Sequence, residues 1–321
     1  MDSNARIFIC GHGGMVGSAC VRRFRAAGCT QLILRSHAEL ELRDRTAVEE
    51  FFSRERPEYV VLAAAKVGGI MANRDHCSQF LLENLEIQNN VIMAAFRHKV
   101  KKFCFLGSSC IYPRECPQPI REEYLLGGPL EPTNEGYALA KIAGYKLCCY
   151  LSREFGWRTV SLMPCNLYGA NDNYALPGCH VFPALIRRFA EASAAGAPQV
   201  ELWGTGRPLR EFMHVDDLAN AVWYFMQTRE DPEFLNVGSG QEISIRELAG
   251  KIAAAAGYQG RIVWDESRPD GMPRKLMDCT RARKAGWQAA ISLDEGIRRT
   301  LVQYRQRYMP SPAQNFPAGL Y

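Results

Sequence analysis

Residues 11–17 read GHGGMVG, and this stretch decides the fold of the chain. An apolar run at residues 6–10 comes before it, and a helical pattern at residues 15–27 overlaps its end. Gly11 permits a tight turn, Gly14 lets the backbone approach a pyrophosphate, and Gly17 lets helix and strand pack closely. The helix begins at Met15 and Val16, where free N–H groups and partial positive charge favour phosphate. This context favours a dinucleotide-binding loop over its alternative, a plain strand–helix turn.

Apolar runs and helical patterns alternate through the first half of the chain. The runs lie at residues 31–34, 59–64, 102–106 and 159–163, and the helical patterns at 46–54, 84–98 and 134–155. Such alternation is typical of a parallel sheet with helices on both faces. We therefore predict an α/β fold with a doubly wound parallel sheet of the Rossmann type.

The second half is less regular, with many Gly, Pro and Asn residues between 166 and 208. Helices are expected at 182–195, 215–228, 245–256 and 293–308, and residues 310–321 are expected to trail over the surface. We expect a dinucleotide-binding domain at 1–165, with 211–237 returning to it. Residues 166–210 and 238–321 would form a smaller α/β substrate domain.

Composition limits the classes of function. The chain has 321 residues, with 39 Lys and Arg against 34 Asp and Glu, a net charge of +5. This mild charge suits an anionic small molecule and is well below that of nucleic-acid binders. No apolar run approaches the ~20 residues of a membrane span, and the N-terminal residues lack a signal-peptide core. The 12 cysteines include no Cys-x-x-Cys pair, so we expect no metal cage and a reduced, cytoplasmic protein.

The end of the second apolar run bears on the choice of cofactor. An acidic residue at this position binds the ribose hydroxyl of NAD, whereas an arginine suits the 2′-phosphate of NADP. Here Arg35 follows the run and no acid does, which favours NADP; a solvated strand-end charge is the alternative. Asp44 is a candidate contact for adenine or, equally, an N-cap of the next helix.

Three polar residues after the fourth run suggest carbonyl chemistry. Ser108 follows that strand, and Tyr137 and Lys141 lie four residues apart in a helical pattern, which places them on one helix face. A lysine cation near a phenol favours phenolate and would lower the tyrosine pKa from about 10. The order of glycine loop, Ser and Tyr-x-x-x-Lys is far more specific than any one of them.

On these residues the chain resembles the extended short-chain dehydrogenases/reductases, and within them the GDP-L-fucose synthases. The resemblance covers residues 7–287, and GSSCIYP is its most specific segment. It implies C3 and C5 epimerisation of GDP-4-keto-6-deoxy-D-mannose, followed by reduction at C4 with NADPH. The other segments that carry it are GHGGMVGSA, LAAAKVGGI, EPTNEGYALAKIAG, MPCNLYGANDN, REFMHVDDLA and PDGMPRKLMD.

The resemblance also implies roles for individual residues. Cys110 would be the base and His180 the acid of epimerisation; without it, Cys110 is an inert half-buried thiol and His180 an ordinary loop histidine. Ser108 and Tyr137 would bind the C4 oxygen, and Lys141 the nicotinamide ribose. The family match further assigns Asn166 and His180 to the nicotinamide side of the cofactor site and Arg188, Trp203, Arg210 and Asp270 to the GDP moiety.

Two departures from the family pattern concern the 2′-phosphate. Many of these enzymes have an arginine where this chain has Gly13 and a further basic group near His37, which leaves Arg35 as the main discriminator. The family commonly forms homodimers through the helices here at 84–98 and 134–155.

Two alternative functions are left open. One is another sugar-nucleotide epimerase or dehydratase that holds NAD, and the other is a non-catalytic redox sensor on the same fold. His214 is expected to structure the start of the helix that carries Asp216 and Asp217.

Overall fold

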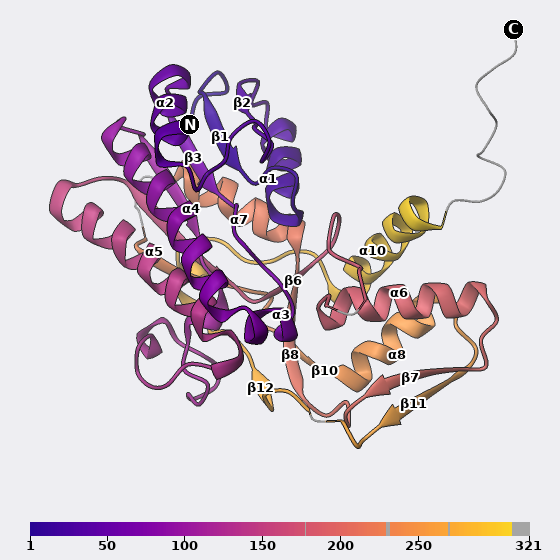
Figure 1. The fold of residues 1–321 in the computed structure, drawn as a ribbon. Helices are drawn as coiled ribbons and strands as arrows, with labels where there is room; N and C mark the ends of the chain where they lie inside the picture. Colours follow the sequence, from indigo (N-terminus) through magenta and orange to yellow (C-terminus); the bar gives the residue numbers. More distant parts are fainter. Residues whose placement is uncertain (177, 229–231, 269, 310–321) are drawn as a thin grey trace, which may run out of the picture.

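A six-stranded parallel sheet forms the larger part of the molecule (Figure 1). The computed structural model describes residues 1–176, 178–228, 232–268 and 270–309. Most of its strands are buried apolar runs, as expected where helices cover both faces. The order across the sheet is β2 (Leu32–Ile33), β1 (Ile7–Cys10), β3 (Tyr59–Leu62), β4 (Lys102–Leu106), β5 (Thr159–Pro164) and β9 (Phe234–Val237). The predicted fold class is therefore confirmed.

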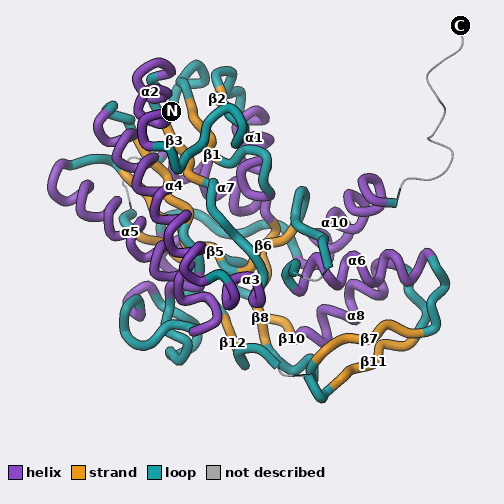
Figure 2. The backbone as a smooth tube through the Cα atoms, viewed as in Figure 1, coloured by secondary structure: helices purple, strands orange, loops and turns teal. Residues whose placement is uncertain are grey.

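Helices cover the two faces of this sheet (Figure 2). One group packs together through α2 (Arg45–Glu55), α4 (Cys77–Arg97) and α5 (Glu135–Phe155), and the other through α1 (Met15–Ala26) and α7 (Val215–Gln227). The helix predicted at residues 84–98 begins earlier, at Cys77, and the short α3 (Ile70–Asp75) precedes it. α4 has no side-chain cap at His76, so the sequence carries no local signal for its start.

The smaller part combines two minor sheets with three long helices. One sheet contains β6 (Asn166–Tyr168), β8 (Leu209–His214), β10 (Glu242–Ser244) and β12 (Arg274–Lys275), and the other β7 (Gln199–Trp203) and β11 (Arg261–Asp265). These six strands were not predicted. The helices are α6 (Val181–Ala194), α8 (Ile245–Ala256) and α10 (Leu293–Tyr308), as expected from the sequence. Short elements are η1 (Ser109–Ile111), η2 (Glu122–Tyr124), η3 (Pro132–Asn134) and α9 (Thr280–Lys284).

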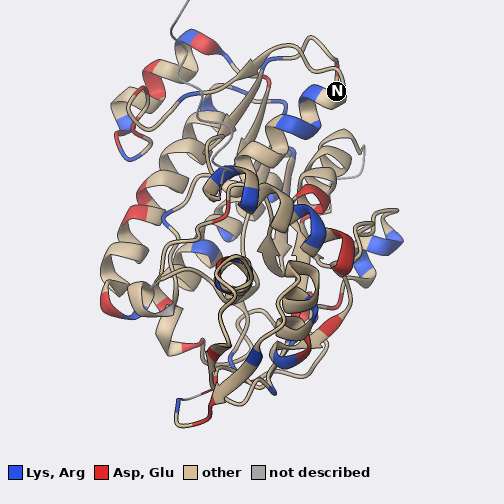
Figure 3. Cartoon of the chain, turned by 90° about the vertical axis from the view of Figure 1, so that its right-hand side faces the viewer, with Lys and Arg blue, Asp and Glu red and all other residues tan. Residues whose placement is uncertain are grey.

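Two separate apolar cores match these two parts. The larger contains the six-stranded sheet with α1, α2, α4, α5 and α7, and the smaller lies between α6, α8 and α10. Basic and acidic positions are interspersed along the helices (Figure 3). No helix in the described part of the chain is long and apolar enough to cross a membrane. The segment expected to trail over the surface, 310–321, lies outside the described residues.

Candidate active site

The glycine loop forms a tight cradle between β1 and α1. A Cβ on Gly11, whose φ is +74°, would lie 2.8 Å from the Ala64 Cα, and a Cβ on Gly17 would lie 2.1 Å from the Gly11 carbonyl oxygen. Gly14 is the N-cap of α1, has no side chain to cap it, and no acidic residue follows in the first turn. The first N–H groups of the helix, from Met15 onward, therefore have no intrahelical acceptor. This geometry fits a pyrophosphate.

Arg35 lies half-buried at the end of β2. Its Nη2 donates to the Glu55 carboxylate at 2.8 Å, its Nη1 donates to the Leu34 carbonyl oxygen at 2.9 Å, and its guanidinium lies 5.9 Å from the centre of the Phe51 ring. One of the Arg35 donors is therefore already bound to a carboxylate in this structure.

Gly13 faces open space, whereas His37 and Asp44 are engaged in local contacts. Nothing lies within 4 Å of a Cβ built on Gly13. The His37 Nε2 lies 2.9 Å from the Glu41 Oε2. The Asp44 carboxylate accepts from the Ala47 backbone N–H at 3.1 Å, so Asp44 is the N-cap of α2, one of the two roles considered for it.

Ser108 and Cys110 lie directly beyond the carboxyl end of β4, at the sheet edge where open α/β folds bind ligands. The Ser108 hydroxyl accepts from the Cys110 backbone N–H at 3.2 Å and thereby begins η1. The Asn134 Nδ2 lies 3.2 Å from the Cys110 sulfur, and the Lys275 Nζ lies 3.9 Å from it. Sequence reasoning did not identify Asn134 or Lys275.

Tyr137 and Lys141 share the inner face of α5, as their spacing predicts. The Lys141 Nζ lies 5.7 Å from the centre of the Tyr137 ring and donates to the Leu106 carbonyl oxygen at 2.9 Å. Burial lowers the pKa of Lys141 to about 8. The predicted lowering of the Tyr137 pKa is wrong: desolvation raises that pKa well above its usual value, Cys110 adds to the rise, and a hydrogen bond with Ser108 lowers it only in part. In the described structure Tyr137 is therefore a phenol, suited to donating a proton.

His180 and Asn166 come from the smaller part of the molecule. His180 is the N-cap residue of α6 and is exposed, yet packing around its imidazole lowers its pKa by desolvation. The loop before it touches the segment after β3, since a Cβ on Gly69 would lie 2.5 Å from the Gly178 carbonyl oxygen. Asn166 lies on β6, and its Nδ2 donates to the Glu211 carbonyl oxygen at 2.8 Å.

The four residues assigned to GDP occupy two neighbouring places. Asp270 accepts from the Thr205 N–H and hydroxyl at 2.9 and 2.6 Å, and its charge interacts with Arg210 on β8, whose pKa burial lowers. The Arg188 guanidinium on α6 donates to the Glu201 carbonyl oxygen on β7 at 2.7 Å. Trp203 ends β7 and is 63% exposed, so it is not part of the apolar core, and the Arg268 guanidinium lies 5.1 Å from the centre of its ring.

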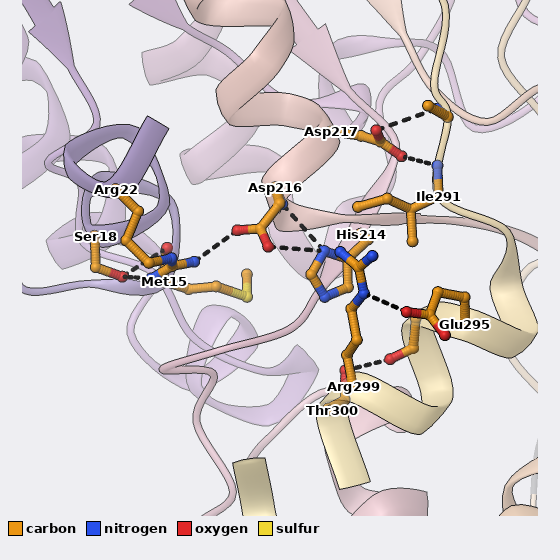
Figure 4. A network of polar contacts seen from close by, with 12 residues as sticks. Met15, Ser18, Arg22, His214, Asp216, Asp217, Ile291, Glu295, Arg299 and Thr300 are labelled. Carbon is orange, nitrogen blue, oxygen red and sulfur yellow. Dashed lines mark hydrogen bonds and ion pairs between the residues drawn. The ribbon is translucent and has the colours of Figure 1, made fainter. Parts of the chain in front are cut away.

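Polar contacts link α1 to α7, and α7 to the segment just before α10 (Figure 4). The Arg22 guanidinium on α1 forms an ion pair of 2.7 Å with Asp216. The His214 Nδ1 accepts from the Asp216 backbone N–H at 3.2 Å, so His214 structures the start of α7 as predicted. The Asp217 carboxylate accepts from the Ile291 backbone N–H at 2.9 Å, just before α10. The contact of this network that reaches α1 is the Arg22–Asp216 ion pair, whose two side chains are both partly exposed.

A phosphate cradle on a doubly wound sheet, with Ser108, Tyr137 and Lys141 at the carboxyl edge, defines a nucleotide-dependent enzyme of the reductase and epimerase class. The chain belongs to the NAD dependent epimerase/dehydratase family, whose model matches residues 7–238.

Several named proteins are similar to this chain over nearly its full length. It is 52% identical over 304 residues to "Putative GDP-L-fucose synthase 2" of Arabidopsis thaliana, covering 95% of this chain and 93% of the relative. It is 50% identical over 307 residues to "GDP-L-fucose synthase" of Escherichia coli (strain K12), covering 93% and 96%. Among solved structures, a GDP-mannoheptose C4 reductase from Campylobacter jejuni with NADP bound matches with a TM-score of 0.87 at 37% identity, covering 95% and 99%.

Proposed function

We propose that this protein converts GDP-4-keto-6-deoxy-D-mannose to GDP-L-fucose, by epimerisation at C3 and C5 and reduction at C4 with NADPH. The observation that carries the proposal is that Cys110 and Tyr137 both lie next to Ser108. Ser108 contacts the Cys110 backbone and the Tyr137 phenol, so a thiol and a phenol lie beside the position of a substrate carbonyl. Relatives named GDP-L-fucose synthase, at 50–52% identity, support the same activity.

In the epimerisation, hydrogens at C3 and C5 are acidic because both carbons flank the C4 ketone. Cys110 removes each proton, and Ser108 and Tyr137 donate hydrogen bonds to the oxygen on which the enolate charge develops. His180 returns a proton to the opposite face of the carbon. Its exposed position at the start of α6 allows the imidazole to exchange that proton with solvent.

In the reduction, bound NADPH supplies a hydride to C4. Tyr137 gives its proton to the C4 oxygen, and the raised pKa of the phenol keeps that proton available at neutral pH. Lys141 is held by the Leu106 carbonyl oxygen next to Tyr137, where it would bind the ribose hydroxyls of the nicotinamide. Asn166 and His180 would lie on the nicotinamide side of the site.

The two nucleotide moieties would occupy different parts of the chain. Gly11, Gly14 and Gly17 and the first amides of α1, at Met15 and Val16, would hold the NADPH pyrophosphate, and Arg35 its 2′-phosphate. Arg188 and Arg210 would pair with the GDP diphosphate, Trp203 would stack on a ring, and Asp270 would accept hydrogen bonds from the nucleoside.

The same proposal includes the domain division, assembly and location expected from the sequence. α7 and β9 belong with the larger sheet, which supports the return of 211–237 to the dinucleotide-binding domain of 1–165, although β8 pairs in the smaller sheet.

Exposed Leu82 on α4 and Tyr150 and Phe155 on α5 support a homodimer through these helices. All 12 cysteines are free, which supports the reducing cytoplasm.

The test follows NADPH oxidation and product formation with GDP-4-keto-6-deoxy-D-mannose. We expect the wild type to form GDP-L-fucose, Cys110→Ser to lose exchange of the C3 and C5 hydrogens with solvent, and Tyr137→Phe to lose reduction. A wild type that oxidises neither NADPH nor NADH would refute the proposal. It would then favour an epimerase or dehydratase that holds NAD, or a redox sensor on this fold.

A further inference from the structure

A lysine from the smaller part of the molecule reaches the sulfur of Cys110. The Lys275 Nζ lies 3.9 Å from that sulfur and the Asn134 Nδ2 lies 3.2 Å from it, and both atoms are hydrogen-bond donors. Lysine has three donors and no acceptor, so it can only stabilise electron density on the sulfur. Among the described residues, Lys275 forms no ion pair with a carboxylate, so its charge is not neutralised by a neighbouring acid.

The backbone on both sides of Lys275 is tied in place. β12 pairs in parallel with β8, with Lys275 opposite Arg210. The next two backbone N–H groups donate to side chains, from Leu276 to the Gln118 amide oxygen at 2.9 Å and from Met277 to the Glu211 carboxylate at 2.8 Å. Lys275 therefore extends from a strand that hydrogen bonds to its backbone neighbours hold in place.

We propose that Lys275 is a positioning residue that holds Cys110 as a thiolate for the epimerisation. The inference rests on the function proposed above. The thiolate takes the proton from C3 or C5 and becomes a thiol, and the C–H electron pair moves into the enolate. His180 gives a proton to the carbon, and the thiol and imidazole then exchange protons with water, so atoms and charge balance.

The other groups around the sulfur do not provide this charge. Tyr137 faces Cys110 from α5 as a neutral phenol, Asn134 from η3 as an amide, and Ser108 as a hydroxyl. The charge of Lys275 also acts to lower the pKa of the Cys116 thiol, although burial raises that pKa overall. An opposite charge within about 4–6 Å favours the ionised form of a group by about one to three pH units. Removing the ammonium should therefore reduce the thiolate fraction about tenfold or more at neutral pH.

The first experiment needs no substrate. The rate of iodoacetamide alkylation at Cys110 is followed by mass spectrometry from pH 5 to 10 in the wild type, Lys275→Met and Lys275→Arg, with exposed Cys77 as reference in the same chain. In Lys275→Met we expect the midpoint for Cys110 to rise by about one pH unit and that for Cys77 to stay, and in Lys275→Arg we expect the wild-type curve. Lys275→Gln gives a second neutral variant, and circular dichroism checks that each folds. An unchanged Cys110 curve in both neutral variants would overturn the proposal.

The second experiment separates epimerisation from reduction. Exchange of the C3 and C5 hydrogens in D₂O is compared with oxidation of GDP-L-fucose by NADP⁺, and the ratio of the two rates should fall about tenfold in Lys275→Met. A fall in exchange with an unchanged alkylation curve would show that Lys275 contacts substrate instead, which also overturns the proposal. A shifted alkylation curve in a protein that never exchanges or reduces the sugar would support the Lys275–Cys110 coupling and refute the proposed function.

Discussion

Replacing Gly17 by alanine tests the phosphate cradle directly. The added Cβ would lie 2.1 Å from the Gly11 carbonyl oxygen, whereas ordinary contact begins at 3.4 Å, and the nearby atoms are all backbone. The start of α1 must therefore retreat from the loop by about 1.3 Å. Hydrogen bonds of about 2.9 Å from the first amides of α1 to a phosphate would stretch beyond about 4 Å and be lost.

The expected magnitude follows from those lost hydrogen bonds. A hydrogen bond to a charged group contributes about 1.5–3 kcal/mol, so the loss of two weakens NADPH binding by about 3–6 kcal/mol, or at least 100-fold in Kd. Overpacking adds a loss of about 1–3 kcal/mol in folding stability. We expect Gly17→Ala to fold with a lowered melting temperature and to bind NADPH at least 100-fold more weakly in a calorimetric titration.

The matched control is Gly13→Ala in the same loop. A Cβ at Gly13 meets nothing within 4 Å, so this variant should bind NADPH within about twofold of the wild type. Near-wild-type binding by Gly17→Ala would refute the placement of the pyrophosphate at the start of α1. Equal loss in both variants would show that the loop acts through flexibility and not through close packing.

Three further predictions address the phenol, the cofactor choice and a buried acid. Tyr137→Phe should slow oxidation of GDP-L-fucose by NADP⁺ about 10²–10⁴-fold, because the C4 oxygen loses its proton-transfer partner. The rate is measured from the absorbance of NADPH at 340 nm. A wild-type rate would contradict the assignment of Tyr137 as the proton donor. Glu55→Gln should raise kcat/KM for NADPH over NADH several-fold, because Arg35 loses its carboxylate partner and becomes available to a 2′-phosphate; an unchanged ratio would show that Arg35 is a strand-end charge only. Asp172 is buried with a pKa raised from 3.8 to about 7, so its ionisation opposes folding as pH rises above about 4. Asp172→Asn should then stabilise the fold by at most about 4 kcal/mol at pH 8 and by less than about 1 kcal/mol at pH 4. Urea unfolding measures this difference in the free energy of unfolding. A difference that does not grow with pH would contradict the burial argument.

The larger sheet was predictable because its strands are buried on both faces. Such strands appear in the sequence as continuous apolar runs, and the glycine loop after β1 fixes the connection to α1. The smaller sheets were missed because β6, β10 and β12 have only two or three residues, too few to show a period. β7 does alternate between exposed and buried residues, QVELW, and this pattern was available in the sequence.

The chemistry was predictable where it depends on spacing and not where it depends on burial. The four-residue step from Tyr137 to Lys141 places both on one helix face, as expected. The predicted direction of the Tyr137 pKa shift was wrong because desolvation of the buried phenol raises that pKa, and desolvation is not visible in a spacing. Lys275 was missed because it is 165 residues from Cys110 in the chain, and tertiary contacts such as the pairing of β12 with β8 bring it close.

The position of β9 in the six-stranded sheet has a consequence for biosynthesis. β5 ends at Pro164, but its outer neighbour β9 begins only at Phe234, after the strands β6, β7 and β8. At about 5–20 residues per second, a ribosome needs about 4–14 s to synthesise the intervening chain. Throughout that interval the backbone donors and acceptors of an apolar strand remain an open edge that can pair with other nascent chains. Chains that terminate before Phe234 should therefore aggregate instead of accumulating as a free cofactor-binding domain.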